Sequence, residues 1–344
     1  MTPADLSLTV LHAVRRAVDD GALRVDVPPR VKVERARPGG TGEYATNIAL
    51  TLARPAGRSA LDVAGIIEER LRDVPGLAGV EITGPGFLNF SLRRDAGGEL
   101  VRVIREAGAA YGHGTALAGT AVRFAEVTEE RATLVVGTVV RLLRSQGADA
   151  SFGGDERMYV RPGAYDVEGL GADAARWALL RAAPQDRPLD GPPLLVQHER
   201  NSLFRVRYAY SRVRRLLANG RQLGITPGDG CGPDASYGPG APSWTGPAHE
   251  TDTPYAPHAA ELLAVLGDHP VVLLAAARHR APDRVARHVE AVADALLGFQ
   301  HAVLPLGDEK PSAAHRSRLA LAEAAGTVLA GGLAVLGISA PDRI

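Results

Sequence analysis

Apolar and polar positions follow two different periodicities along the first third of the chain. A spacing of three to four residues, as over 6–18, is typical of an amphipathic helix, and alternation, as over 31–34, is typical of a strand. Ser59 stands where a helix N-cap is expected, and GPG at 84–86 indicates a turn between two strands. The expected elements are helices over 6–18, 44–52 and 60–71 and strands over 31–34, 79–82 and 86–92. This order predicts an α+β domain over residues 1–110, with helices on one face of a small antiparallel sheet.

The remaining two thirds of the chain change character twice. Residues 111–170 carry one strand–helix–strand pattern, with strands over 121–127 and 148–152 and a helix over 134–143. From 171 to 344 the apolar spacing is helical, which predicts an all-α bundle. The expected helices cover 173–180, 203–217, 258–266, 270–277, 282–297 and 312–329. Residues 223–257 are instead rich in glycine and proline, which predicts a flexible loop inserted in the bundle.

Composition and charge narrow the classes of protein. The 344 residues include 39 basic and 39 acidic ones, so any nucleic acid would be held by a local patch or by shape. The single cysteine, Cys231, excludes an internal disulfide, and no signal-peptide pattern opens the chain. Apolar stretches such as 271–277 are far shorter than the ~20 residues of a membrane span. We therefore expect a cytoplasmic protein that does not contact a membrane.

Five short motifs carry a more specific signal. The first domain contains GEYATN at 42–47 and GPGFLNF at 84–90, and the helical part contains GADAARW at 171–177, VRYAYSRV at 206–213 and APDRI at 340–344. The first two resemble the N-terminal additional domain of the arginyl-tRNA synthetase family. The last three resemble the anticodon-binding bundle of that family, known as the DALR domain. The resemblance implies three parts: an N-terminal additional domain at 1–110, a truncated remnant of the nucleotide-binding catalytic domain at 111–170, and a DALR-like bundle at 171–344.

The middle of the chain departs from the family pattern. The family has two histidines near a helix start, whereas 126–137 contains none, and its lysine-methionine-serine-lysine type of loop corresponds to an altered run at 157–163. In the family both loops stabilise the phosphates of ATP, which two glutamates would repel. The degenerate loops comprise Thr128, Glu129, Glu130, Met158, Tyr159, Val160 and Arg161. Only about twenty residues separate the two loops, too few for a complete nucleotide-binding sheet. We therefore expect no catalytic residues, and a chain that is not an enzyme.

One candidate binding site lies in the first domain. Phe87 and Asn89 are two apart on an expected strand, so their side chains share one face. The resemblance implies that this aromatic–amide pair takes an unstacked base of the tRNA D-loop at the elbow, with Thr83 as a neighbour. In the alternative interpretation, the phenylalanine belongs to the core and the asparagine to the hydrogen bonds of the turn. Both interpretations stay open at this point.

A second candidate site lies in the helical part. Tyr208 and Arg212 are four apart on an expected helix and share one face. The resemblance implies that they form an anticodon pocket with Arg343 and Ile344, the last of which replaces a methionine of the family. Four neighbouring arginines add positive charge: Arg205, Arg207, Arg214 and Arg215. The alternative is ordinary bundle packing with an arginine that extends to solvent.

Two functions from different classes follow from these patterns. The first is a non-catalytic tRNA-binding protein that contacts both elbow and anticodon, prefers arginine tRNAs and uses no cofactor. The second is an interaction protein that keeps the synthetase scaffold to bind a protein partner, such as a tRNA-modifying, transferase or metabolic enzyme or a synthetase, without RNA. A ligase with a rebuilt ATP site is disfavoured, because no phosphate-binding loop is visible.

The histidines and the expected short strands bear on metal binding and self-association. The spacings of His279, His288 and His301 match no zinc pattern, so we expect no metal. The short strands within 121–152 would leave sheet edges that need covering, which predicts a homodimer through that region.

Overall fold

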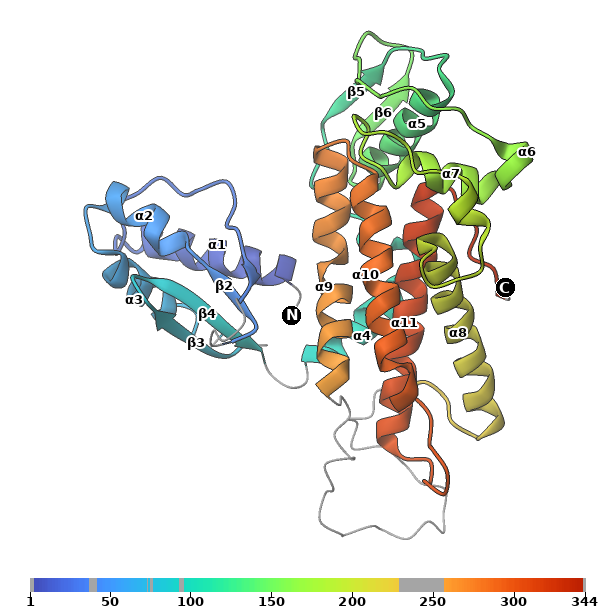
Figure 1. Cartoon of the computed structure of the whole chain (residues 1–344). Coiled ribbons are helices and arrows are strands. Elements are labelled where there is room, and N and C mark those ends of the chain that lie inside the picture. Colours follow the sequence, from blue (N-terminus) through green and yellow to red (C-terminus); the bar gives the residue numbers. More distant parts are fainter. Residues whose placement is uncertain are drawn as a thin grey trace. The chain divides into compact units, whose positions relative to one another are not determined.

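The protein, seen as a computed structural model, is described over residues 3–36, 42–72, 74, 77–92, 96–228 and 257–342. It divides into two compact units, residues 1–100 and 101–344, and the division falls within α4 (Ala96–Ala107) (Figure 1). The expected insertion over 223–257 lies outside the described residues for most of its length, as does Cys231. The three-part division at 110 and 170 stays a prediction.

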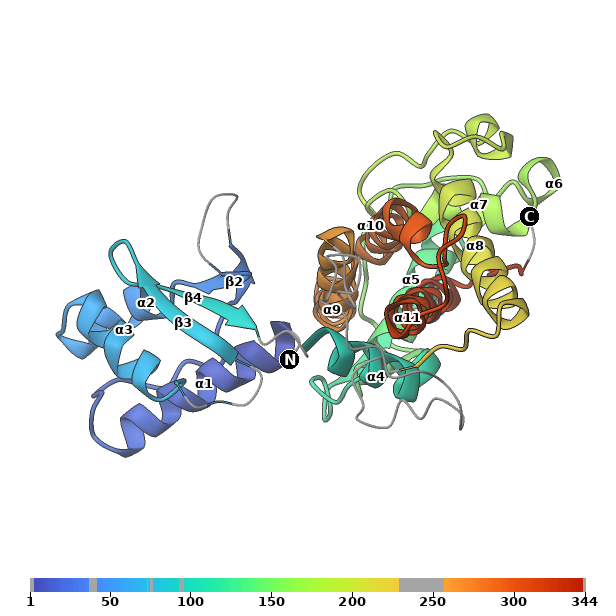
Figure 2. The same cartoon turned by 90° about the horizontal axis from the view of Figure 1, so that it is seen from below.

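The first unit packs helices on one face of a four-stranded antiparallel sheet, as the sequence predicted (Figure 2). The strands lie side by side in the order β1-β2-β4-β3. The elements are α1 (Pro3–Asp19), β1 (Glu34–Arg35), β2 (Tyr44–Thr46), α2 (Ile48–Ala56), α3 (Ala60–Glu69), β3 (Leu77–Thr83) and β4 (Phe87–Leu92). The core joins the apolar stripes of the three helices to Leu88 and Phe90 of β4, neither of which has exposed surface.

Ser59 caps α3 as expected, since its side chain accepts a hydrogen bond from the backbone N–H of Asp62 at 3.1 Å. The expected helix over 44–52 is wrong in its first three residues. These form β2, in which Tyr44 pairs with Phe90 and Thr46 with Leu88, and the helix begins only at Ile48. Pairing with the central strand and burial of both outer side chains outweigh the local helical spacing.

The second unit is mainly helical and includes one parallel strand pair. Its helices are α5 (Glu130–Ser145), α6 (Val167–Leu170), α7 (Ala172–Leu180), α8 (Ser202–Gln222), α9 (Pro257–Arg278), α10 (Asp283–Phe299) and α11 (Ala313–Leu336), with 3₁₀ turns η1 (Gly108–Ala110), η2 (Pro192–Leu195) and η4 (Gln300–Ala302). Its strands are β5 (Ala121–Phe124) and β6 (Asp149–Phe152), joined through α5. The β5–α5–β6 unit and the helical bundle both agree with the sequence pattern. The expected dimer through this strand pair stays a prediction.

A single long helix, α9, replaces the two helices expected over 258–266 and 270–277. Pro270, at which the second helix was expected to begin, lies inside it. A proline has no N–H to donate to the carbonyl four residues earlier. That carbonyl belongs to Leu266, and it accepts a hydrogen bond from the Tyr111 hydroxyl at 3.1 Å. The tyrosine thus supplies the donor that Pro270 lacks, and the helix continues.

Two helices are longer and more apolar than the sequence analysis allowed for. By length and composition alone, Ala259–Arg278 and Ala313–Leu336 could each cross a membrane. Core helices of a bundle pass the same test, and 67% of the apolar window of the second is buried inside the unit. Both helices belong to the bundle, packed against α10 (Figure 1).

The bundle also buries an aromatic and imidazole cluster. The His269 ring lies 5.7 Å from the ring of Tyr111, stacked on it, and 5.1 Å from the ring of His288. Burial, with smaller contributions from His288 and His113, holds the pKa of His269 well below its ordinary value of 6.5. The imidazole is therefore kept neutral in the folded protein.

Candidate nucleic-acid interface

The structure brings Thr83, Phe87 and Asn89 together at one end of the β3–β4 hairpin, a group called the sheet face below. Phe87 pairs with Thr83 across the hairpin and is 39% exposed, whereas Asn89 is buried. The Asn89 amide nitrogen donates to the Thr83 hydroxyl at 2.6 Å. The phenylalanine is therefore not a core residue, whereas the asparagine does belong to the hydrogen bonds of the hairpin, as the alternative interpretation expected. The binding of a tRNA base by this pair stays a prediction.

Glycines shape the turn that carries this face. Gly84 and Gly86 have φ angles of +53° and +129°, a region that side chains rarely adopt. A Cβ on Gly86 would also lie 2.9 Å from the carbonyl oxygen of Ala60, at the start of α3. The hairpin can therefore approach α3 closely, with Phe87 at the start of β4, directly after the turn.

On helix α8, Tyr208 and Arg212 share a face as expected, and this pair is called the helical face below. Tyr208 is 42% exposed and stacks on Phe204, with ring centroids 5.9 Å apart. The Arg212 guanidinium donates through Nε to the side-chain oxygen of Gln300 at 2.7 Å. The aromatic partner Phe204 was missed from the sequence, although its spacing of four from Tyr208 would have indicated the contact.

The positive charge expected around the helical face is largely neutralised. Arg205 pairs with Asp294 at 2.9 Å, Arg207 with Asp173 at 2.9 Å and Arg214 with Asp342 at 2.9 Å. The expectation of a basic surround is therefore wrong for three of the four arginines, since each carboxylate comes from a distant part of the chain. Arg343 and Ile344, the other expected members of this site, lie outside the described residues.

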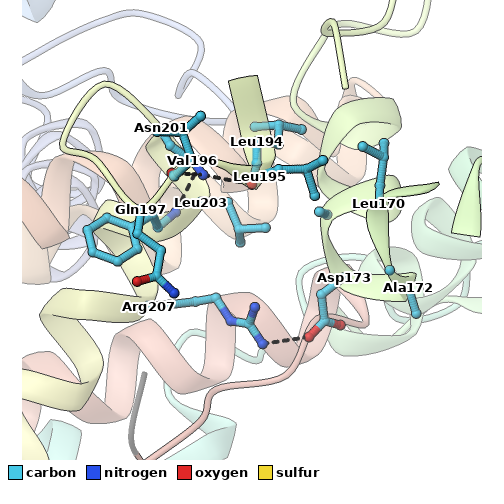
Figure 3. A pocket seen from close by; sticks show the side chains of 13 residues that line it. Leu170, Ala172, Asp173, Leu194, Leu195, Val196, Gln197, Asn201, Leu203 and Arg207 are labelled. Atoms are coloured by element: carbon cyan, nitrogen blue, oxygen red, sulfur yellow. Dashed lines mark hydrogen bonds and ion pairs between the residues drawn. The ribbon is translucent and has the colours of Figure 1, made fainter. Parts of the chain in front are cut away.

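A pocket of about 400 Å³ adjoins the helical face, between the start of α7, η2 and the start of α8 (Figure 3). Phe204 lines it, and the ion pair of Arg207 with Asp173 closes one side. The Asn201 amide donates to two backbone carbonyls of 194–196 at 2.8 and 2.9 Å, which fixes the apolar wall. Its volume falls in the range of small-ligand pockets. It offers apolar walls and one ion pair beside an exposed aromatic stack.

The segments 126–137 and 157–163 lie against each other, and Glu129 and Glu130 hold the backbone between them. Glu129 caps α5 by accepting from the N–H of Ala132 at 2.6 Å, and its second oxygen accepts from the N–H of Gly163 at 2.9 Å. Glu130 accepts from the N–H of Tyr165 at 2.7 Å. Both carboxylates therefore occupy backbone donors around the start of α5, where a helix N-terminus otherwise attracts anions. Thr128 precedes this cap.

Arg131 joins the two loops from the buried side. Its side chain is fully buried, and burial lowers its pKa against the raising effect of Glu129 and Asp186. The guanidinium donates to five backbone carbonyls, at 2.6–3.4 Å: those of Arg161, Leu179, Ala182, Ala183 and Asp186. No local sequence pattern indicates this role, because the carbonyls come from segments 30 to 55 residues away. The loop with Met158, Tyr159 and Val160 is thereby held in place.

The histidines considered as metal ligands lie apart from these sites. In the part of the chain that the structure describes, no three histidine, cysteine or acidic side chains are grouped to hold a metal ion. His279 and His288 line a separate cleft beside α10, and His301 belongs to η4.

Two family models match the chain. The arginyl tRNA synthetase N terminal domain matches residues 8–92, and the DALR anticodon binding domain matches residues 206–344. The arginine–tRNA ligase of Frankia alni is 38% identical over 201 residues, covering 56% of this chain and 35% of that protein. The arginine–tRNA ligase of Micrococcus luteus is 41% identical over 166 residues, covering 44% and 30%. The chain thus spans about a third of the length of these relatives.

Solved structures agree on the fold. The arginyl-tRNA synthetase of Thermus thermophilus aligns over 100% of both chains with a TM-score of 0.66 and 12% identity. That of Plasmodium falciparum aligns over 99% of both chains with a TM-score of 0.63 and 8% identity. At these identities the likeness concerns the fold alone.

The names of the relatives correct one expectation. The sequence analysis predicted that the chain is not an enzyme, whereas the curated relatives that match it are arginine–tRNA ligases. The prediction is therefore contradicted. It was drawn from two altered loops and a short middle segment, which are a weaker guide than identity over some 200 residues.

Proposed function

Because the chain carries the N-terminal domain and the DALR anticodon-binding domain of the arginyl-tRNA synthetase family, we propose that it binds tRNA and prefers tRNAs that accept arginine. The relatives bear both words, arginine and tRNA, in their name. The relatives are named ligases, but the chain spans only about a third of their length. The proposal therefore concerns the binding of tRNA and not ligation. We place this binding in the cytoplasm.

The helical face is the observation that carries the proposal. An exposed tyrosine, Tyr208, rests on Phe204 and so offers a preorganised surface on which an unpaired base can stack. Arg212 is oriented by Gln300 and keeps further donors for a base edge or a phosphate. The pocket beside Phe204 adds a recess of suitable size for a planar group. The proposal is supported by the family model over 206–344, which is described as an anticodon binding domain.

The sheet face supplies the second contact. Phe87 is partly exposed at the start of β4, and Asn89 lies two residues further along this strand with its amide nitrogen bonded to Thr83. In this proposal the Asn89 side-chain oxygen is the acceptor for a base edge. Two sites on one tRNA bind more tightly than either alone, since the second forms at a high effective concentration.

A protein partner is a second candidate function. Leu195 and Val196 are each more than half exposed at the rim of the α7–α8 pocket, which is a surface suited to apolar contact. In this alternative, aspartates from other parts of the chain neutralise arginines of α8 and so remove the positive charge that RNA would need.

Binding of total tRNA at two salt concentrations, followed by sequencing of the retained species, tests the proposal. We expect enrichment of arginine-accepting tRNAs and weaker binding at higher salt. The double variant Phe87→Ala/Tyr208→Ala should lose most of the affinity, because each lost stacking contact costs about 1–3 kcal/mol.

The matched control is Leu8→Ala/Leu223→Ala, which removes one exposed apolar side chain from each unit, one on α1 and one directly after α8. It should bind tRNA like the unaltered protein. Absence of tRNA binding at low salt would overturn the proposal and favour the protein partner.

A further inference from the structure

A second, larger cleft lies away from the helical face. It has a volume of about 1180 Å³ and is bounded by residues 157–159, residues 183–186 and the junction of α9 with α10. Small-ligand pockets usually hold ~300–1000 Å³ and are mostly apolar. This cleft is larger, and its lining includes four arginines: Arg157, Arg280, Arg284 and Arg287.

The arginines of the cleft differ in their partners. Arg280 pairs with Glu156 and lies over the Phe124 ring, 5.3 Å from its centroid, while Arg287 pairs with Asp283 at 2.7 Å. Arg157 and Arg284 are exposed, and neither has a carboxylate partner among the residues that the structure describes. Two of the four arginines of the cleft are thus paired with carboxylates, and the other two present their guanidinium groups to solvent.

The acidic side chains in the lining do not cancel this charge. Asp283 is buried and bonded to Arg287, and Asp186 is the second carboxylate of the lining. Together with Glu156, the partner of Arg280, four guanidinium groups thus face three carboxylates, which leaves one excess positive charge. A dense anion is the complementary ligand.

An aromatic side chain stands beside this charge. Tyr159 is 75% exposed and is two residues from Arg157. A tyrosine that packs against so little of its own protein contributes little to folding, whereas it offers a face for a base. Cation and aromatic ring together are typical of surfaces that follow a nucleic-acid strand.

The walls of the cleft are fixed before any ligand arrives. The N–H of Arg161 donates to the carbonyl of Pro184 at 2.8 Å, which ties the first wall to the second. Arg131 holds Arg161, Ala183 and Asp186 through their carbonyls. A preorganised surface loses little conformational entropy on binding.

From these observations we propose that the cleft binds the phosphodiester backbone of RNA, with Arg157 and Arg284 pairing with phosphates and Tyr159 stacking on a base. The inference rests on the proposed function in that tRNA is the RNA expected. It adds a contact separate from the sheet face and the helical face. The cleft's size and charged lining favour a polymer over a free nucleotide.

The test is the salt dependence of tRNA binding by Arg157→Gln/Arg284→Gln. Loss of two phosphate contacts should reduce the slope of log affinity against log salt by about 1.4–1.8, from ~0.7–0.9 per phosphate. Arg187→Gln/Arg221→Gln removes the same charge from exposed positions that do not line the cleft, and should leave the slope nearly unchanged. Tyr159→Ala should weaken binding about fivefold or more, and Tyr159→Phe should restore it. All altered side chains are exposed, and thermal melting of each variant checks that folding is retained.

The outcomes separate the two proposals. If tRNA binds but the cleft variant and the charge-matched control have equal slopes, the cleft inference falls and the proposed function stands. If Phe87→Ala/Tyr208→Ala still binds a short single-stranded RNA and Arg157→Gln/Arg284→Gln does not, the cleft is supported independently. If the unaltered protein binds neither tRNA nor the short RNA, both proposals fall. If pyrophosphate alone displaces the RNA from the cleft at low concentration, the site is one for a free anion and the backbone assignment is overturned.

Discussion

Replacement of Arg131 by methionine tests the central structural claim about the second unit. Methionine keeps most of the buried apolar stem, so the change removes chiefly the guanidinium and its five hydrogen bonds to carbonyls. Each such bond to a charged group contributes about 1.5–3 kcal/mol. The bonds share one side chain, however, and water can reach some carbonyls in the variant. We therefore expect a loss of about 3–5 kcal/mol, in the range for breaking a buried charged network.

The assay is thermal unfolding followed by tryptophan fluorescence. Both tryptophans of the chain, Trp177 and Trp244, belong to residues 101–344, so the signal reports on the second unit alone. For a unit of this size, 1 kcal/mol shifts the melting temperature by about 2–4 °C, so Arg131→Met should melt roughly 6–20 °C lower.

The control for this prediction comes from the same helix. Arg144 is exposed and donates from Nε to the carbonyl of Ala150 at 2.7 Å, so Arg144→Met should cost less than about 1 kcal/mol. Equal melting temperatures of Arg131→Met and Arg144→Met would refute the claim that Arg131 holds the two loops together.

Three further predictions concern the sheet face and the buried imidazole. Thr83→Val should lower the stability of the first unit by about 1 kcal/mol and weaken tRNA binding, because Asn89 loses its hydroxyl partner; urea unfolding of the variant and its tRNA affinity measure this, and unchanged values would contradict the role. Gly86→Ala should destabilise by about 1–3 kcal/mol, since φ is +129° and the new Cβ meets the Ala60 carbonyl; a urea midpoint equal to that of the parent would contradict it. Below pH 6.5 the unfolded chain protonates His269, while the folded chain keeps it neutral. The contribution of this group to the free energy of unfolding is therefore fully present above that pH and falls by up to ~1.4 kcal/mol per pH unit below it. The unfolding free energy of the parent should therefore fall relative to that of His269→Leu as the pH is lowered from 7.5 to 5. A difference between the two proteins that does not change with pH would contradict the lowered pKa.

Much of the fold could be predicted, because helices and strands are set by apolar spacing over a few neighbouring residues. The helix N-cap at Ser59, the β5–α5–β6 unit and the helical bundle all follow from such local patterns. Prediction failed where a distant partner decides the local state. Residues 44–46 became a strand through pairing with β4, and α9 continued past Pro270 because Tyr111 supplies a donor.

The candidate sites divide in the same way. The sequence alone determined which residues share a face, such as Phe87 with Asn89 and Tyr208 with Arg212, because side-chain direction repeats every two residues in a strand and about every four in a helix. It also indicated the similarity to arginyl-tRNA synthetases, since four of the five motifs lie within the ranges that the two family models match. The molecular surface that these residues present was decided only by the tertiary structure.

Electrostatic partners explain that difference. Asp294 and Asp342 neutralise arginines of α8 from 89 and 128 residues away. Arg157 and Arg284, 127 residues apart, line one cleft without a described carboxylate partner. Whether a charge is free or paired depends on distances of a few ångströms between atoms, and only the folded chain sets those distances between segments so far apart in sequence.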